Sequence, residues 1–363
     1  MTFSMLNIIL VFLAFELLGS VGLVQGHSLF ARSISNDTLA NFRLFAQYSA
    51  ASYCDNNNDD GIIGSIYCIE GVCPVVEAAN AQTLAEFNQE DIRGFVAVDD
   101  THRVIVVAFR GSNSVRNWLK NFQFWKIKDP GPGGFWNKLF GSDKPKRGND
   151  ICACGIHSGF YKSWELVKAE VVDAVSKAKE TYKDYNVVIT GHSLGAAIAT
   201  IAGAHLRTIQ IPCDIYSYGS PRIGDERFAE FISNQPGLTF RITHGYDPVT
   251  SLPPMSLFGV YDLGYRHSWP EYWISDSSTE GTDIIQVCNG MENLSCNGTR
   301  ESKFDFQIDD HRQYLGEISA CGPKFTYRDM EETWSAEDLR RVGTFASNDM
   351  LFADQFFFNR IGA

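Results

Sequence analysis

The chain has 363 residues, of which 44% are hydrophobic and 20% charged, and its formal net charge is −12. This balance is typical of a globular protein, and the length accommodates one large α/β domain with extensions or two small domains. The excess of acidic residues excludes electrostatic attraction to nucleic acid phosphates or to an anionic bilayer, so any contact with lipid must depend on apolar surface.

The N-terminal segment is predicted to be a secretion signal. Residues Met5–Leu18 are almost all apolar, and small residues follow up to Gly26. This run is too short to cross a bilayer and is typical of a signal-peptide core, although no Lys or Arg precedes Arg32. An uncleaved membrane anchor is the alternative. We expect residues 1–26 to be removed and the mature chain to be secreted and extracellular.

The cysteine count and three glycosylation sequons also indicate export. Nine cysteines favour an oxidising compartment. Because the number is odd, one thiol is left over, and Cys213, just before an apolar strand pattern, is predicted to be a buried free thiol. The Asn-x-Ser/Thr sequons, which carry glycans only on exposed segments of secreted chains, are at Asn36, Asn293 and Asn297.

Apolar periodicity predicts an alternation of helices and strands along the chain. In order, we expect a helix over 41–53, strands over 94–98 and 103–109, a helix over 164–182, a strand over 186–190, a helix over 196–206, and strands over 214–218 and 239–243. Buried strands that alternate with helices predict an α/β fold with a mostly parallel sheet and helices on both faces. In the C-terminal tail, Ser335 with Asp338 three residues later resembles a helix start.

The segment Gly191–Gly195 is a G-x-S-x-G motif with Ser193 at its centre. An apolar strand pattern precedes it and a helical pattern follows it, which is the context that a nucleophile turn requires. Glycines flank the serine because this turn leaves no room for side chains, and the start of the next helix favours a developing oxyanion. The pattern predicts Ser193 as a nucleophile; a structural Gly/Ser turn is the alternative.

A nucleophilic serine needs a base and a carboxylate that orients the base. Where the serine lies in a G-x-S-x-G turn, the carboxylate (Asp or Glu) comes next along the chain and the histidine comes last. Asp247 comes directly after a predicted strand, at the end where catalytic groups of open α/β sheets gather. Three other carboxylates compete with it, namely Asp214, Asp225 and Asp262. Two late histidines, His267 and His311, are candidate bases, and spacing does not separate them.

Six strings in the sequence, GHSLGAA, FRGSNSVRNW, FAQYSAASYC, ITHGYDPVTSLPP, HSWPEYWI and DDHRQYLG, together resemble the class 3 lipase family of filamentous fungi. The resemblance spans about Phe42 to Cys321. It implies an α/β-hydrolase fold and a secreted lipase that hydrolyses acylglycerols through an acyl-enzyme. Within the family, FRGSNSVRNW is most similar to the mono- and diacylglycerol lipases.

The resemblance also implies the site residues. Ser193 matches the nucleophile, Asp247 the acid of the triad, and His311 the catalytic histidine near the C-terminus. The hydroxyl of Ser112 and the backbone N–H of Leu194 match the two donors of the oxyanion hole. No metal or organic cofactor is implied, and the histidines of this chain show no metal-ligand spacing.

The family has a short helical lid after the FRGS strand, which corresponds here to about 114–122. Trp118, Leu119 and Phe122 supply its apolar face, which covers the site in water and inserts at a lipid surface. Plain core packing is the alternative for these side chains. Feruloyl esterases of the same fold have a polar segment at this place, so the lid favours a lipid substrate.

The resemblance implies three disulfide bonds, Cys54–Cys321, Cys68–Cys73 and Cys152–Cys154, and a fourth that only some relatives have, Cys288–Cys296. The third departs from the C-x-x-C spacing of the family, because a single residue between the cysteines gives a tight ring. The lipase domain is expected to cover 27–322. Within it, the inserted loop 126–150 is either an interfacial contact or a solvated loop. The C-terminal extension, 323–363, either packs its phenylalanines over an apolar surface or is removed after secretion.

We therefore expect a serine carboxylic ester hydrolase of the triacylglycerol lipase type, with interfacial activation. Its partner is an acylglycerol at a lipid–water interface, and the chain is expected to be a monomer without nucleic acid or stable protein partners. The alternatives are a lipase restricted to mono- and diacylglycerols, a feruloyl-type esterase acting on soluble or cell-wall esters, and a non-catalytic secreted binding protein. The complete set of Ser193, Asp247 and His311 argues against the last of these.

Overall fold

The computed structural model describes residues 34–58, 63–111, 151–275, 285–293, 295–297, 308–322 and 336–361, and all of them belong to one structural unit, Ser33–Ala363. Several predicted features lie outside the described residues: the signal segment 1–26, Ser112, the lid over 114–122 with Trp118, Leu119 and Phe122, and the inserted loop 126–150. None of the described helices has the length and hydropathy that crossing a bilayer would require.

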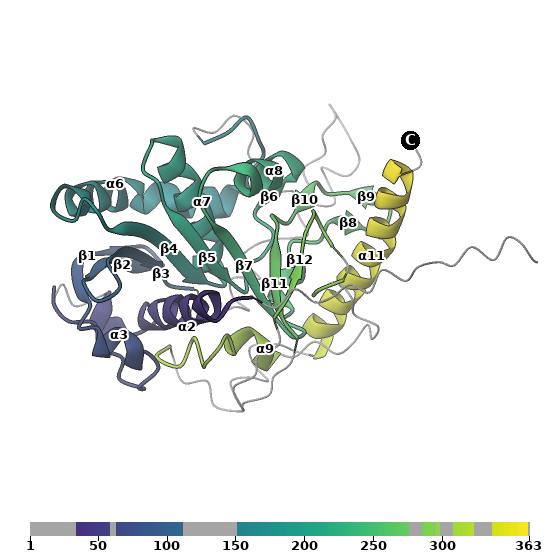
Figure 1. Ribbon diagram of the computed structural model, residues 1–363. Coiled ribbons are helices and arrows are strands. Elements are labelled where there is room, and N and C mark those ends of the chain that lie inside the picture. Colours follow the sequence, from purple (N-terminus) through teal and green to yellow (C-terminus); the bar gives the residue numbers. More distant parts are fainter. Residues whose placement is uncertain are drawn as a thin grey trace, which may run out of the picture. The chain divides into compact units, whose positions relative to one another are not determined.

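An eight-stranded sheet forms the centre of this unit (Figure 1). Its strands lie in the order β1 (Gln82–Gln89), β2 (Ile92–Asp99), β3 (Val104–Phe109), β4 (Asn186–His192), β5 (Asp214–Tyr218), β7 (Thr239–His244), β11 (Glu271–Ile274) and β12 (Ile285–Cys288). Neighbouring strands from β3 to β11 are parallel. The β1–β2, β2–β3 and β11–β12 pairs are antiparallel. The sheet is thus mixed and mostly parallel, which confirms the predicted α/β class.

Helices cover both faces of the sheet (Figure 1). Every residue of β3 is buried, and alternate side chains enter different cores, as the two-residue period of a strand requires. Ile105, Val107 and Phe109 pack in a cluster with α6 (Ser158–Thr181), α7 (Leu194–Thr208) and α8 (Glu226–Asn234). Val104, Val106 and Ala108 pack in a second cluster with α2 (Asn36–Ala51) and α3 (Pro74–Ala78). The continuous apolar run in the sequence is the consequence of this two-sided burial.

The predicted elements of the sheet core are present, and their ends differ from the expected ones for local reasons. The helix predicted from residue 41 begins five residues earlier, because the hydroxyl of Ser35 caps it by accepting the N–H of Thr38 at 3.1 Å. Strand β1 was not predicted, since only two of its eight residues are buried. Strands β11 and β12 have four residues each, which is too short for a periodic signal.

The remaining elements are short, apart from the last helix. They are the 3-10 helices η1 (Asp55–Asn57) and η2 (Val249–Ser251), the paired strands β6 (Gly224–Asp225) and β10 (Tyr265–Arg266), the hairpin strands β8 (Ser256–Leu257) and β9 (Tyr261–Asp262), and the helices α9 (Ile308–Arg312) and α11 (Ala336–Ile361). Helix α11 lies in the predicted C-terminal extension and begins directly after Ser335, as the sequence indicates.

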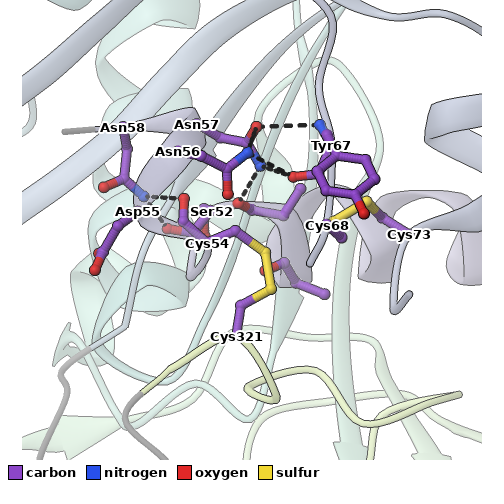
Figure 2. Close-up of a disulfide and its surroundings, with 12 residues drawn as sticks. Ser52, Cys54, Asp55, Asn56, Asn57, Asn58, Tyr67, Cys68, Cys73 and Cys321 are labelled. Carbon is purple, nitrogen blue, oxygen red and sulfur yellow. Dashed lines mark hydrogen bonds between the residues drawn. A yellow bond between two sulfur atoms is a disulfide. The ribbon is translucent and has the colours of Figure 1, made fainter. Parts of the chain in front are cut away.

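Eight of the nine cysteines are bonded in the pairs that the family resemblance implies, and Cys213 is a buried free thiol. The Cys54–Cys321 bond joins residues 267 positions apart in sequence. Figure 2 shows this bond beside η1, next to the Cys68–Cys73 bond. Side-chain amides fix the turn there: that of Asn57 donates to the carbonyls of Ala51 and Tyr67, both at 3.0 Å. The turn after α2 is therefore held in one conformation.

A buried group of charges anchors helix α11. The guanidinium of Arg222 lies 3.1 Å from the carboxylate of Asp349 on α11 and 3.2 Å from that of Glu292, and all three side chains are buried. Asp349 also accepts the backbone N–H groups of Met255 and Ser256, each at 2.9 Å. Burial alone would raise the pKa of Glu292, but Arg222 and other neighbours lower it to about 2. One cation therefore serves two carboxylates, one of them on the extension.

Near this anchor, Phe352 of α11 packs on Met255 in a small separate cluster, and the guanidinium carbon of Arg266 lies 5.6 Å from the centre of its ring. This contact is an instance of the packing given above as one alternative for the extension. The side chains of the later phenylalanines, Phe356, Phe357 and Phe358, lie outside those that the structure describes.

Replacing Arg222 by Met should destabilise the protein by about 3–5 kcal/mol at pH 7, because two buried carboxylates lose their counter-charge. Glu292 has a folded pKa of about 2, so its pairing with Arg222 still stabilises the wild type at pH 4 and is lost only as the pH falls through that value. Burial already raises the pKa of Asp349 to about 6, and loss of Arg222 raises it further, which adds to the deficit above the unfolded carboxyl pKa of about 4. The deficit should therefore be largest at pH 7 and shrink as the pH falls towards 2, and urea unfolding at pH 2 and pH 7 measures it. The control, Arg340→Met at an exposed position of α11, should change stability by less than about 0.5 kcal/mol at either pH.

Candidate active site

A sharp turn carries Ser193 between β4 and α7. Its φ and ψ are 59° and −124°, a left-handed backbone conformation that is uncommon for a residue with a side chain. A Cβ on Gly191 would lie 2.4 Å from the carbonyl oxygen of Gly195, and one on Gly195 would lie 2.2 Å from that of Phe109. Both glycines are therefore required by close backbone approach. The turn is the strand-to-helix elbow that the motif predicts.

The side chains of Ser193, His311 and Asp247 meet in the interior. His311 Nε2 lies 2.9 Å from Ser193 Oγ, and His311 Nδ1 lies 2.8 Å from Asp247 Oδ2. All three residues are at least 98% buried. A carboxylate only accepts hydrogen bonds, so Nδ1 carries the ring proton and Nε2 is free to accept the serine hydroxyl. This is the arrangement of a nucleophile, a general base and an orienting acid.

Asp247 is held in its ionised form by three donors. Besides the ring of His311, Asp247 Oδ2 accepts the hydroxyl of Tyr314 at 2.5 Å, and Oδ1 accepts the backbone N–H of Val249 at 2.8 Å. Burial alone would raise the pKa of Asp247, but His311, Tyr314 and the N–H of Val249 outweigh it and lower the pKa. Sequence reasoning missed Tyr314. The available signal was a tyrosine three residues after a candidate base, which is near enough in sequence to share its carboxylate partner.

The rival histidine, His267, lies elsewhere in the core. Its Nε2 donates to the carbonyl of Thr250 at 2.7 Å, and its backbone N–H donates to Glu292 at 2.5 Å. Burial lowers the pKa of its ring well below the ordinary value. His267 is thus a neutral, hydrogen-bonded core residue, and the structure brings His311 to the serine instead.

The rival carboxylates have structural partners away from Ser193. Asp214 accepts the backbone N–H directly before β7 at 2.8 Å, and Asp225 caps the start of α8. Asp262 pairs with Arg266 at 2.9 Å on the β8–β9 hairpin. Of the four candidate carboxylates, Asp247 is the one that contacts a candidate base.

Of the two predicted donors of the oxyanion hole, Leu194 lies within the described residues and Ser112 does not. Leu194 is the first residue of α7, where backbone N–H groups have no partner within the helix and the helix dipole favours negative charge. Gly111 is the last described residue before Ser112, and a Cβ on it would lie 2.8 Å from the carbonyl oxygen of His192. The strand end that precedes Ser112 therefore lies against the nucleophile turn. The hydroxyl of Ser112 itself remains a proposed donor.

Comparisons with known proteins agree with this geometry. A model of the class 3 lipases matches residues 106–257, and a model of the lipase 3 N-terminal region matches residues 18–85. A secreted mono- and diacylglycerol lipase from Fusarium solani is 37% identical over 298 residues, which are 81% of this chain and 80% of the relative. The chain belongs to the class 3 lipase family. It is a secreted, lipase-type serine hydrolase, as its sequence indicates.

Solved structures confirm that this lipase has the α/β-hydrolase fold. The mono- and diacylglycerol lipase of Aspergillus oryzae matches with a TM-score of 0.66 and 34% identity, over 78% of this chain and 98% of that one. The triacylglyceride lipase of Rhizomucor miehei matches with a TM-score of 0.64 and 25% identity, over 80% and 99%. Nearly all of each solved chain is matched but only four-fifths of this one. This lipase therefore has segments beyond the shared fold.

The three sequons of the lipase differ in exposure. Asn36 is exposed at the first turn of α2, and Asn293 is half-buried. Asn297 is buried, and its side-chain oxygen accepts the hydroxyl of Thr250 at 3.2 Å. A glycan on Asn297 would require this side chain to leave the interior, and glycosylation there stays a prediction. The sequon pattern carries no information on burial.

Two groups of side chains within the described residues have metal-ligand spacing: Cys54, Cys68 and Cys321, and Cys68, Cys73 and Glu77. All these cysteines are in disulfide bonds, and a metal requires the thiolate form. These groups are therefore structural, and neither contacts the candidate triad.

Replacing Tyr314 by Phe should destabilise this lipase by about 1–3 kcal/mol at neutral pH, because a buried charged acceptor loses a donor. Tyr314 stabilises ionised Asp247, whose folded pKa is lowered. The contribution is thus fully present above the ordinary aspartate pKa of about 3.9 and is lost as the pH falls through the folded value. Chemical unfolding at pH 7 and in acid measures it. The control is Tyr185→Phe, which removes an exposed hydrogen bond to Asp100 and should cost less than about 0.5 kcal/mol.

Proposed function

We propose that this lipase hydrolyses the ester bonds of mono- and diacylglycerols through an acyl-enzyme on Ser193. The observation that carries the chemistry is the continuous hydrogen-bonded series from Ser193 Oγ through His311 to Asp247. A non-catalytic binding protein has no need for a hydroxyl, an imidazole and a carboxylate hydrogen-bonded in this order, so the arrangement supports catalysis.

In the first step, Ser193 Oγ attacks the ester carbonyl carbon while His311 Nε2 takes the hydroxyl proton. His311 then gives this proton to the departing glycerol oxygen, and the acyl group stays on Ser193. Water attacks the acyl-enzyme, its proton passes to His311 and then to Ser193, and the fatty acid leaves. Asp247 stays ionised throughout and stabilises the imidazolium. The N–H of Leu194 and the hydroxyl of Ser112 bind the oxyanion, each contributing about 3 kcal/mol.

The preference for partial glycerides rests on similarity. The solved mono- and diacylglycerol lipase of Aspergillus oryzae is 34% identical to this chain, whereas the solved triacylglyceride lipase of Rhizomucor miehei is 25% identical. The FRGSNSVRNW string supports the same assignment. We therefore favour the restricted lipase over the triacylglycerol lipase expected first. Interfacial activation through a lid over 114–122 is part of the proposal, and it separates a lipase from a feruloyl-type esterase.

The Ser193→Ala variant should lose fluorophosphonate labelling and more than about 99.9% of ester hydrolysis, because no other described group is placed to form the acyl-enzyme. Its unfolding free energy should stay close to that of the wild type. The matched control is Ser217→Ala, a buried serine on β5 whose hydroxyl donates to the carbonyl of Phe240. It should keep labelling and turnover. Full activity in Ser193→Ala would refute the assignment.

A series of ester substrates tests which class of ester the enzyme prefers. Emulsified mono-, di- and triolein and a soluble feruloyl ester are compared by the rate of acid release per titrated serine. We expect mono- and diolein to react at least about tenfold faster than triolein. A tenfold ratio of rates corresponds to a difference of about 1.4 kcal/mol in transition-state stabilisation. We also expect a rate increase above the solubility limit. Equal rates on triolein would favour a triacylglycerol lipase, and a preference for the feruloyl ester would favour the esterase.

A further inference from the structure

His192, the residue before the nucleophile, has a defined proton arrangement that the triad does not explain. Its ring is buried; Nε2 lies 2.7 Å from the carbonyl oxygen of His311, and Nδ1 lies 2.7 Å from the hydroxyl of Tyr53. A carbonyl only accepts, so Nε2 must carry a proton. Burial and the neighbouring His311 lower the pKa of His192 well below its ordinary value, so the ring is neutral. Nδ1 is then an acceptor, and Tyr53 is the donor.

The hydroxyl of Tyr53 also contacts the other side of the site. It lies against Gly111, where a Cβ would be only 2.0 Å from it, and the backbone of Gly111 lowers the Tyr53 pKa that burial raises. Gly111 directly precedes Ser112, the proposed oxyanion donor. One hydroxyl thus contacts the strand end that leads to the oxyanion hole and bonds to the ring that binds the backbone of the general base.

Tyr53 itself is firmly placed. Its ring is 97% buried, and it lies in the turn between α2 and η1, directly before the Cys54–Cys321 bond. Two residues on, Asp55 accepts the guanidinium of Arg110 at 2.7 Å, so this turn contacts both Arg110 and Gly111. Figure 2 shows Asp55, the amides of η1 and the Cys54–Cys321 bond around this turn. The turn is therefore a rigid support beside the triad.

His311 needs such support because it lies on α9, a helix of five residues. A helix this short is not stable alone, and its last carbonyl groups have no partners within the helix. Two imidazoles supply partners: His192 at the end of β4 binds the carbonyl of His311, and Nδ1 of His244 at the end of β7 binds the carbonyl of Asp310 at 3.0 Å. The sheet thus holds α9 through hydrogen bonds to consecutive carbonyls.

We propose that Tyr53 is a positioning residue of this lipase: through His192 it fixes the backbone of the catalytic base, and through Gly111 it fixes the approach to the oxyanion hole. This inference rests on the proposed function. Tyr53 does not touch the reacting atoms. Tyr53 instead determines where the reacting groups lie. A displacement of such groups by about 1 Å lowers the rate about a hundredfold.

Replacing Tyr53 by Phe removes the hydroxyl and keeps the ring, whose centre lies 5.8 Å from that of His192. On a soluble p-nitrophenyl ester, kcat per fluorophosphonate-titrated site should fall about tenfold with KM changed less than about twofold. The rate of fluorophosphonate labelling should fall by a similar factor. The matched control is Tyr48→Phe on the same helix region, which removes a buried hydroxyl bonded to Asp99 at 2.8 Å. It should lower stability and leave kcat within about twofold.

A pair of variants at His192 provides the second readout. His192→Gln keeps an amide N–H at about the place of Nε2, whereas His192→Leu keeps only bulk. We expect the Gln variant to retain several times more kcat per titrated site than the Leu variant, with both folded by circular dichroism. This rescue follows from a hydrogen bond and not from packing.

Two results would overturn the inference: wild-type kcat in Tyr53→Phe, or equal kcat in the two His192 variants. A loss in Tyr48→Phe as large as that in Tyr53→Phe would also overturn it, because any buried hydroxyl would then do the same. Absence of fluorophosphonate labelling in the wild type would instead refute the proposed function, and this inference would fall with it.

Discussion

The hydrogen bond between His311 and Ser193 joins two residues that are separated by 118 positions in sequence. Its length of 2.9 Å depends on the elements that position each of the two side chains. Ser193 follows β4 directly, and Asp247 lies three residues after the end of β7. Because these strands are parallel members of one sheet, their carboxyl ends meet at the same edge. His311 has no strand of its own and reaches this edge on a five-residue helix that the sheet binds by its carbonyls.

Buried charge recurs in this lipase, and each buried carboxylate has specific donors. Asp247 has His311, Tyr314 and a backbone N–H, and Asp349 has Arg222 and two backbone N–H groups. The guanidinium of Arg222 also donates to the carbonyls of Ser251 and Pro253, in the segment that follows Asp247. The extension and the segment behind the triad acid are therefore held by the same side chain. Loss of this cation would affect both at once.

Local patterns in the sequence were sufficient for the core of the fold and for the strand-to-helix turn at Ser193. Strands β3 and β4 are buried on both faces, so their apolar runs are unmistakable, and Ser193 lies between a strand pattern and a helix pattern. Strand β1 is half-exposed and was missed. His311 and His267 were not separable by spacing, because what distinguishes them is which residues surround them in space. Family resemblance supplied that choice before the structure did.

The supporting residues of the site could not be predicted in the same way. Tyr53 lies 139 residues before His192, and nothing in the local sequence of either predicts their contact. At Asn297 the sequon is local and complete, and burial of the side chain is what the sequence does not indicate. Contacts made across elements are set by tertiary packing, which a single sequence does not encode in any local period.

The Cys54–Cys321 bond closes a covalent ring that runs from just after α2 to the segment after the catalytic base. A protease that cut the backbone once anywhere inside this ring would leave both pieces attached, with the nucleophile and the base still on one molecule. Such a nicked enzyme would migrate as a single band until a reductant separated the pieces. Outside the cell, this bond would keep the residues of the active site on one molecule after a single cut in a loop.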